Sequence, residues 1–209
     1  DKKVNEIYLS TPQTVDVARL KIFIESAHQL NIKVLYLEGD QIGEGYNTQN
    51  AIDRIKASLS VDLFDGVKLD YEIKDKAWGA YNQAIRTILH EIRPLTKRLE
   101  FDIPFWWPKD SVEIINQYCD VVTFMSYRDN SEGTIQLIKL GRKYLKIPFI
   151  IGLETGKTDE KTGDQSISFY GRSEAYLNQE INKIERYYKW NKKFLGIAIH
   201  HHSSYLVMK

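Results

Sequence analysis

The chain has 209 residues, of which 43% are hydrophobic and 27% charged, and its formal net charge at pH 7 is +1. This length suffices for one substantial domain with its own core, and the balanced charge argues against nucleic acid or an anionic membrane as the main partner. No apolar run approaches the roughly 20 residues that span a bilayer, so we expect no membrane insertion.

Seven segments rich in Val, Ile, Leu and Phe predict β-strands, and amphipathic segments between them predict helices. In chain order, the strands are expected at 5–10, 34–40, 64–72, 99–107, 120–127, 148–155 and 194–202. The helices are expected at 15–30, 47–59, 78–92, 110–117, 134–145 and 173–192. Before the first of these helices, Thr11 and Pro12 are typical of an N-cap and a first helical position.

Apolar strands that alternate with helices indicate an α/β fold whose parallel sheet is covered on both sides. Seven repeats in one run favour a barrel over a doubly wound sheet, and a complete (β/α)8 barrel typically has about 250 residues. We therefore expect a single domain over 1–209 with the fold of a (β/α)8 TIM barrel that lacks one repeat.

Two further features concern the compartment in which the protein acts. Cys119 is the only cysteine, so no disulfide can form within the chain, and we interpret this residue as a small core side chain. The sequence begins at Asp1 without Met. A removed secretion signal would account for this start, and so would an excised segment; we expect a secreted or cell-surface protein.

The predicted strand FDGVKLDYE carries Lys68, Asp70 and Glu72 at alternate positions. Side chains on a strand alternate between its faces, so these three point the same way. Charges on a buried face are costly unless they are paired or used, and we expect Lys68 to pair with Asp70 or with another interior carboxylate. The Cα atoms of Asp70 and Glu72 lie about 6.6 Å apart on a strand, close enough for each carboxylate to affect the pKa of the other.

The C-terminal ends of the strands carry function in (β/α)8 barrels, and unusual residues collect at these ends here. They are Glu38, Asp70, Glu72, Trp106, Trp107, Tyr127, Arg128, Asp129, Glu154 and His200. Aromatic faces stack on sugar rings and paired carboxylates hydrolyse glycosidic bonds. This combination predicts a site for an oligosaccharide or polysaccharide, with no cofactor.

Several of these residues have a purely structural alternative. Trp106 and Trp107 can pack under a loop, Arg128 and Asp129 can pair with each other, and Glu38 can be an ordinary charge at the rim. His200 and His202 share a face of the last predicted strand and would offer two metal ligands.

The segment DGVKLDYE (65–72) resembles the DGxDxDxE signature of the chitinase-like family 18 glycoside hydrolases, with Lys68 in place of the middle Asp. The segment MSYRD (125–129) similarly resembles the Met-x-Tyr-Asp segment of that family, interrupted by Arg128. The resemblance implies that Glu72 is the general acid, that Asp70 orients the N-acetyl group of the substrate, and that Tyr127 supports the acetamido oxygen.

A second resemblance, to retaining glycosidases of the broader barrel clan, places the acid/base at Glu72 and a nucleophile at Glu154. We therefore expect a glycoside hydrolase of a polysaccharide or cell-wall glycan, in which Asp70, Glu72, Tyr127 and Glu154 open onto one cleft. The alternatives are a carbohydrate-binding barrel without catalysis and a metal-dependent hydrolase that uses His200 and His202.

Overall fold

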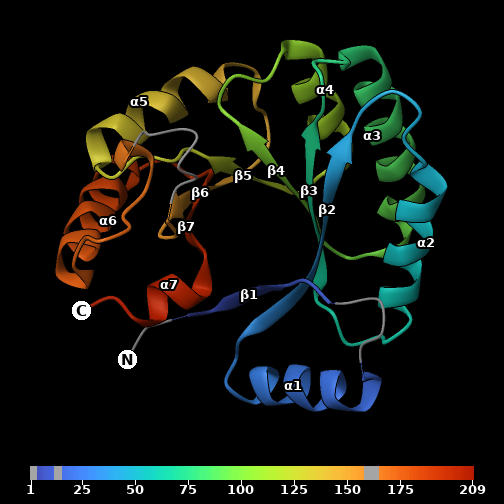
Figure 1. Cartoon of the computed structure of the whole chain (residues 1–209), viewed down its shortest axis with the longest axis horizontal. Helices are drawn as coiled ribbons and strands as arrows, with labels where there is room; N and C mark the ends of the chain where they lie inside the picture. Colours follow the sequence, from blue (N-terminus) through green and yellow to red (C-terminus); the bar gives the residue numbers. More distant parts are fainter. Residues whose placement is uncertain (1–3, 12–15, 158–164) are drawn as a thin grey trace. The chain divides into compact units, whose positions relative to one another are not determined.

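Helices and strands alternate along the chain in the computed structural model, which describes residues 4–11, 16–157 and 165–209 (Figure 1). The strands are β1 (Glu6–Leu9), β2 (Lys33–Ile42), β3 (Gly66–Ile73), β4 (Leu99–Pro104), β5 (Val121–Met125), β6 (Phe149–Glu154) and β7 (Phe194–His200). The α-helices are α1 (Val17–Gln29), α2 (Thr48–Leu59), α3 (Trp78–Ile92), α4 (Lys109–Tyr118), α5 (Ser131–Gly141), α6 (Glu174–Tyr188) and α7 (His202–Leu206).

The strands of the described residues follow one another in chain order in a seven-stranded sheet. The strand pairs run parallel, as helical crossovers between consecutive strands require. An α/β fold of this kind is that of an incomplete (β/α)8 TIM barrel. The fold class expected from the sequence is therefore confirmed.

The chain divides into two compact units. The first comprises Asp1–Asp102 and Glu113–Asp120, and the second comprises Ile103–Val112 and Val121–Lys209. The prediction of one domain over 1–209 stays a prediction.

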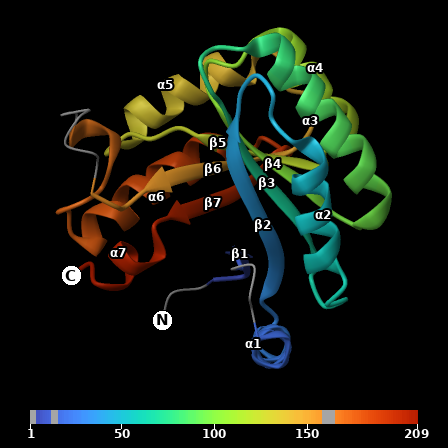
Figure 2. The same cartoon turned by 45° about the vertical axis from the view of Figure 1, so that its right-hand side comes forward.

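In the first unit, β2 and β3 pair over eight residues, from Leu35 opposite Gly66 to Ile42 opposite Ile73. The helices α2 and α3 lie side by side along these strands (Figure 1). The helix α1 lies beside the start of β2, as the end-on view in Figure 2 shows. A cluster of buried apolar side chains fixes it there: Leu20, Ile24, Ala27, Val34 and Val61. Burial of such side chains supplies most of the stability of a unit of this size.

The start of α1 differs from the prediction. Asp16 is the N-cap, and its Oδ1 accepts hydrogen bonds from the backbone N–H groups of Ala18 (3.0 Å) and Arg19 (3.2 Å). An ionised carboxylate satisfies two free N–H groups here and also interacts favourably with the helix dipole. The expected N-cap at Thr11 is therefore wrong, while Pro12 lies outside the described residues.

In the second unit, β6 pairs with β5 on one side and β7 on the other, and its first five residues are buried. The helices α5 and α6 pack against each other (Figure 1). Between them the buried carboxylate of Glu180 accepts a hydrogen bond from the backbone N–H of Ser131 (2.7 Å) and pairs with Lys183 (2.6 Å). A buried side chain of α6 thus satisfies the first N–H group of α5.

Five strands end earlier than predicted: β1, β4, β5, which stops at Met125 before Tyr127, β6 and β7. The strand β4 stops at Pro104, so Trp106 and Trp107 both lie beyond it, Trp106 in a turn. The strand β7 stops at His200 because His201 has a left-handed backbone conformation (φ 69°), and His202 already begins α7. The prediction that His200 and His202 share a strand face is therefore wrong.

Candidate active site

The three charged residues of β3 change steadily in exposure along the strand. Lys68 is only 3% exposed, Asp70 is half-buried, and Glu72 near the end of the strand is exposed. They point to one face, as the alternation of a strand requires. The strand thus leads from a buried interior to an open C-terminal end, and its two carboxylates occupy the outer part.

The neighbouring strand β2 approaches Asp70 closely. Its register partner there is Gly39, and a Cβ at Gly39 would lie 2.6 Å from the backbone oxygen and 3.3 Å from the Cβ of Asp70. A side chain at position 39 would therefore force the two strands apart. Two residues further along, Gln41 faces Glu72, so an amide stands beside the proposed general acid.

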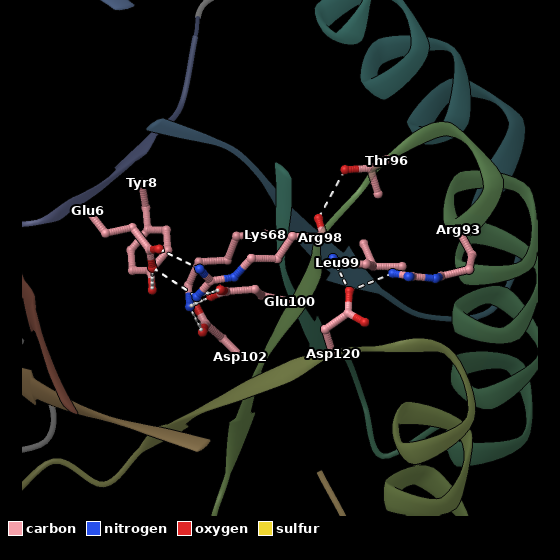
Figure 3. A network of polar contacts seen from close by, with 10 residues as sticks. All are labelled: Glu6, Tyr8, Lys68, Arg93, Thr96, Arg98, Leu99, Glu100, Asp102 and Asp120. Carbon is pink, nitrogen blue, oxygen red and sulfur yellow. Dashed lines mark hydrogen bonds and ion pairs between the residues drawn. The ribbon is translucent and has the colours of Figure 1, made fainter. Parts of the chain in front are cut away.

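Lys68 pairs with two carboxylates of β4. Its Nζ lies 2.6 Å from Asp102 Oδ1 and 3.6 Å from Glu100 Oε2, and 4.0 Å from the centroid of the Tyr8 ring (Figure 3). The prediction that Lys68 reaches an interior carboxylate is confirmed. An unpaired ammonium group at this buried position would cost a prohibitive amount of folding free energy, and the pairing avoids that cost.

Arg98 extends this cluster of charges toward β1. Its guanidinium pairs with Glu6 at 2.8 Å and with Glu100, as Figure 3 shows. Burial raises the pKa of Glu100, whereas the positive charges of Lys68 and Arg98 lower it, and burial prevails. The interior of the first unit thus holds three carboxylates, those of Glu6, Glu100 and Asp102, around two cations.

Glu38 lies on the opposite face of the sheet. Its register partner is Leu69, whereas Asp70 and Glu72 face the other way. The Glu38 carboxylate accepts a hydrogen bond from Tyr36 Oη and pairs with Arg54 of α2 at 2.7 Å. This ion pair with a covering helix accounts for Glu38, and the structure does not bring it together with Asp70.

In the second unit, three of the expected residues meet. The Glu154 carboxylate at the end of β6 accepts hydrogen bonds from His200 Nδ1 and from the backbone N–H of Gly156. The His200 ring in turn stacks on Tyr127, with centroids 5.9 Å apart and planes 14° apart. Burial alone would raise the pKa of Glu154, but the bonds from His200 and Gly156 outweigh it and lower the pKa. Glu154 is therefore an ionised carboxylate held beside an imidazole.

Arg128 and Asp129 have separate roles in the structure. The Arg128 guanidinium donates to the backbone oxygen of Tyr127 (2.8 Å), while the Asp129 carboxylate is buried and pairs with Arg172 (2.6 Å). Asp129 also accepts a hydrogen bond from the side chain of Asn130 (2.9 Å). The Asp129 carboxylate thus anchors the segment that carries Arg172.

The two tryptophans after β4 differ in exposure. Trp107 is 8% exposed and belongs to the core of the second unit, whereas Trp106 is 54% exposed. Only Trp106 has enough free surface to stack on a sugar ring. Sugar binding by either residue stays a prediction.

The metal alternative receives no support from the arrangement of possible ligands. Within residues 4–11, 16–157 and 165–209, no three side chains of His, Cys, Asp or Glu come together as a metal site would require.

Over the same part of the chain, no helix has both the length and the apolar character needed to cross a bilayer.

Sequence reasoning missed a group of residues at the C-terminal ends of β2 and β3 and in the loops that follow. Gln41, Tyr46 and Lys74 line a hollow of about 400 Å³ at the C-terminal ends of these strands. The available signal was their position, because each follows a charged strand end within a few residues. They were missed because a polar loop by itself says nothing about whether its side chains enclose a space.

The predicted catalytic residues fall into both units. Asp70 and Glu72 lie in the first, and Tyr127 and Glu154 in the second. A common cleft for all four stays a prediction.

No protein-family model matches the chain, and no curated protein sequence matches it. Solved structures do match. The YdjI aldolase from Escherichia coli K12 has a TM-score of 0.50 and 14% identity, covering 93% of this chain and 62% of that one. The Group II chitinase catalytic domain 2 of Ostrinia furnacalis has a TM-score of 0.47 and 14% identity, with coverage of 72% and 56%. The spore cortex-lytic enzyme SleL of Bacillus megaterium QM B1551 has a TM-score of 0.47 and 12% identity, with coverage of 64% and 38%.

The likeness is one of fold. This chain spans less than two thirds of the length of each of these three proteins. At such low identity, folds are shared among enzymes with different chemistry, so the activity has to be argued from the site itself.

Proposed function

We propose that the protein is a glycoside hydrolase of a polysaccharide or cell-wall glycan, with Glu72 as its general acid. The observation that carries the proposal is the course of β3 from the buried, paired Lys68 to the half-buried Asp70 and the exposed Glu72. A general acid must reach the glycosidic oxygen, and Glu72 is the residue of this face that is open to a polymer. Asp70, two residues deeper, supplies the second carboxylate that such hydrolysis uses.

In the mechanism we favour, the Glu72 carboxyl donates its proton to the leaving oxygen as the glycosidic bond breaks. In place of a protein nucleophile, the acetamido oxygen of an N-acetylated sugar bonds to the anomeric carbon as the leaving oxygen departs; water then adds to that carbon and gives a proton back to Glu72. Asp70 orients that acetamido group, and Tyr127 supports its oxygen, as the resemblance to family 18 implies. The substrate we propose is accordingly an N-acetylated glycan.

The second mechanism assigns the nucleophile to Glu154. Its lowered pKa favours the ionised form that a nucleophile needs. Substitution of Glu154 by Ala, assayed with added azide, separates the two mechanisms. Rescue through a glycosyl azide product would identify Glu154 as the nucleophile, whereas near-normal activity without azide supports the substrate-assisted scheme.

The direct test of the function is Glu72→Gln, assayed with chromogenic N-acetylglucosaminides and with N-acetylchitohexaose. We expect turnover to fall by about 10²–10⁴-fold, the usual worth of a positioned proton donor, with the affinity for the oligosaccharide retained. Glu132→Gln, at an exposed position of α5, is the matched control and should leave turnover unchanged. Unchanged turnover in Glu72→Gln would refute the assignment.

A carbohydrate-binding protein without catalysis is the second candidate, since Lys68 occupies the place of a signature carboxylate and is committed to Asp102. This second candidate function predicts that the wild-type protein binds N-acetylchitohexaose but converts none of it. The same two measurements, binding and turnover, therefore decide between the candidates.

We also propose that the protein acts in the secreted or cell-surface compartment, because cell-wall glycans lie outside the membrane. Detection of the protein in the culture medium or the surface fraction of its source cells tests this. Detection only in the cytosol would contradict it.

A further inference from the structure

Two segments of the second unit, residues 139–146 and 186–195, contain eight lysine and arginine residues and no acidic residue. All eight of these basic side chains are exposed. The whole chain holds 29 basic and 28 acidic residues, so the remainder of the chain is net acidic. The net charge of +1 therefore averages two unlike parts of the molecule and says little about this surface.

The two segments lie side by side where β6 and β7 begin. The first residues of these strands, Phe149 and Phe194, are register partners. Lys193 Nζ donates a hydrogen bond to the backbone oxygen of Lys146 (2.7 Å), which joins one segment to the other. The helices α5 and α6, which lead into the two segments, also pack against each other. The exposed side chains of the two segments thus form one surface, which we call the basic edge.

Large apolar and aromatic side chains project among the charges of the basic edge. The exposed fractions are 86% for Trp190, 66% for Leu140, 53% for Tyr187 and 51% for Leu195. Lys189 Nζ lies 4.9 Å from the centroid of the Trp190 ring, and Lys139 Nζ lies 5.0 Å from that of the Tyr187 ring. Exposed apolar side chains that gather within a polar surface mark a site of interaction.

Buried aromatic packing supports the basic edge from inside the unit. Tyr188 is almost fully buried, and its ring packs on Phe149 (5.6 Å between centroids) and on Phe194 (5.3 Å). The Tyr187 ring meets Tyr188 edge-on at 4.9 Å. A ring that is ordered in this way before binding loses little conformational entropy when a partner covers it.

The composition of the basic edge favours a lipid surface over other anionic partners. Six of its eight cations are lysines, whose compact hydrated charge suits a diffuse anionic surface, whereas nucleic-acid phosphates favour the planar fork of arginine. Leu140 and Leu195 are aliphatic, so they gain nothing by stacking on bases, but they gain by entering the boundary between headgroups and acyl chains. Tryptophan and tyrosine rings prefer the same zone.

We propose that the basic edge is a docking surface for an anionic lipid bilayer, with its lysines against the headgroups and with Trp190 and Leu140 in the interfacial zone. The contact is peripheral. Since β6 runs from Phe149 to Glu154, Glu154 lies at the other end of the strand, about 16 Å from the basic edge. That end of the unit faces away from the bilayer and stays accessible. The inference does not depend on the proposed hydrolase activity.

The test is flotation of the full chain with unilamellar vesicles of phosphatidylcholine, alone or with about 30% phosphatidylglycerol. We expect at least about tenfold tighter binding to the anionic vesicles at about 0.1 M NaCl, and loss of most of this affinity at about 0.5 M. Lys189→Gln combined with Lys192→Gln should weaken binding by about 25-fold, from about fivefold for each lysine near an anionic surface. Lys21→Gln combined with Lys33→Gln removes two exposed charges from the first unit and should leave the affinity within about twofold.

Trp190 reports whether apolar side chains enter the interfacial zone. Trp190→Ala should weaken binding to the anionic vesicles by about tenfold or more, because a large apolar surface stays in water. Trp190→Phe should keep most of the affinity but lose the blue shift of tryptophan emission that the vesicles produce. Trp106→Ala, at another exposed tryptophan of the same unit, should change neither the affinity nor the blue shift.

Each outcome decides for or against the bilayer. Equal binding to neutral and anionic vesicles, or unchanged affinity in the lysine double variant and in Trp190→Ala, would overturn the proposal. Tighter binding of duplex DNA or heparin than of the anionic vesicles at the same salt would assign the basic edge to a soluble polyanion and reject the bilayer. Salt-sensitive binding with a blue shift that depends on Trp190 would support the proposal, whether or not the protein hydrolyses a glycan.

Discussion

Replacement of Lys68 by Met tests whether the charges inside the first unit are held as a pair. Methionine has a similar length and fits an apolar environment, but it removes the ammonium that lies 2.6 Å from Asp102 and 3.6 Å from Glu100. Lys68 is 3% exposed and Glu100 is fully buried, so water cannot replace the lost partner. Two carboxylates would then remain with reduced compensation in a buried environment.

Loss of one partner of a buried ion pair typically costs about 3–5 kcal/mol of folding free energy. Domains of this size are stable by only about 5–15 kcal/mol, so the variant should lose a large share of its stability. Arg98 still pairs with Glu100, which places the expected loss toward the lower end, about 3 kcal/mol. The loss should be read from urea unfolding followed by circular dichroism.

The loss should also depend on pH. Burial raises the pKa of Glu100 above its unfolded value, so ionisation of this carboxyl costs stability as the pH rises from the unfolded to the folded pKa. Without Lys68 that cost grows. The deficit of Lys68→Met should therefore be larger at neutral pH than at about pH 4, where carboxyl groups begin to protonate.

Lys56→Met is the matched control, because Lys56 forms an exposed pair with Glu91 at 3.5 Å. Such pairs contribute about 0–1 kcal/mol. A double variant that also carries Asp102→Asn should recover part of the lost stability, since it removes one uncompensated charge. If Lys68→Met cost no more than Lys56→Met at neutral pH, the account of a tightly paired interior would be refuted.

Two further predictions concern carboxylates of the second unit. His200→Ala should raise the pKa of Glu154, because His200 helps to lower it. In the wild-type protein, the stability that this pairing contributes is present above the unfolded pKa of Glu154 and is lost as the pH falls through the folded pKa. The urea midpoints of the two proteins should therefore converge in acid, and parallel pH profiles would contradict the pairing. Glu180→Leu should cost about 1–3 kcal/mol of folding free energy, because it leaves the buried N–H of Ser131 without its acceptor. Lys183→Met removes only a half-exposed partner of Glu180 and should cost less than about 1 kcal/mol. Equal losses of the two variants in urea unfolding would show that the hydrogen bond is not the cause.

The sequence was sufficient to predict the strands and the course of β3. Alternation with period two is a local property, so the shared face of Lys68, Asp70 and Glu72 followed from their spacing alone. The partners of Lys68 did not follow, because strand register depends on the whole sheet. Glu100 and Asp102 are two residues apart on β4, so they share a face of that strand. The sequence does not say whether this is the face of Lys68 until the register is known.

The residues at which helices and strands begin and end could also not be predicted from the local sequence. Thr11 and Asp16 are both good N-caps, and only the packing of the helix on the sheet selects between them. His201 continues an apolar strand in the sequence, yet it adopts a left-handed conformation, which histidine tolerates better than most residues. Glu38 was expected at a site because acidic strand ends are often functional, whereas Arg54 on the covering helix provides its partner.

The exposure gradient along β3 has a consequence for how this protein can change in evolution. Lys68 cannot vary without Asp102 or Glu100, because a single substitution would leave a buried charge with too little compensation. Glu72, at the open end, is under no such coupling. In a set of related sequences, positions 68, 100 and 102 should therefore change together, while position 72 changes only when the chemistry does.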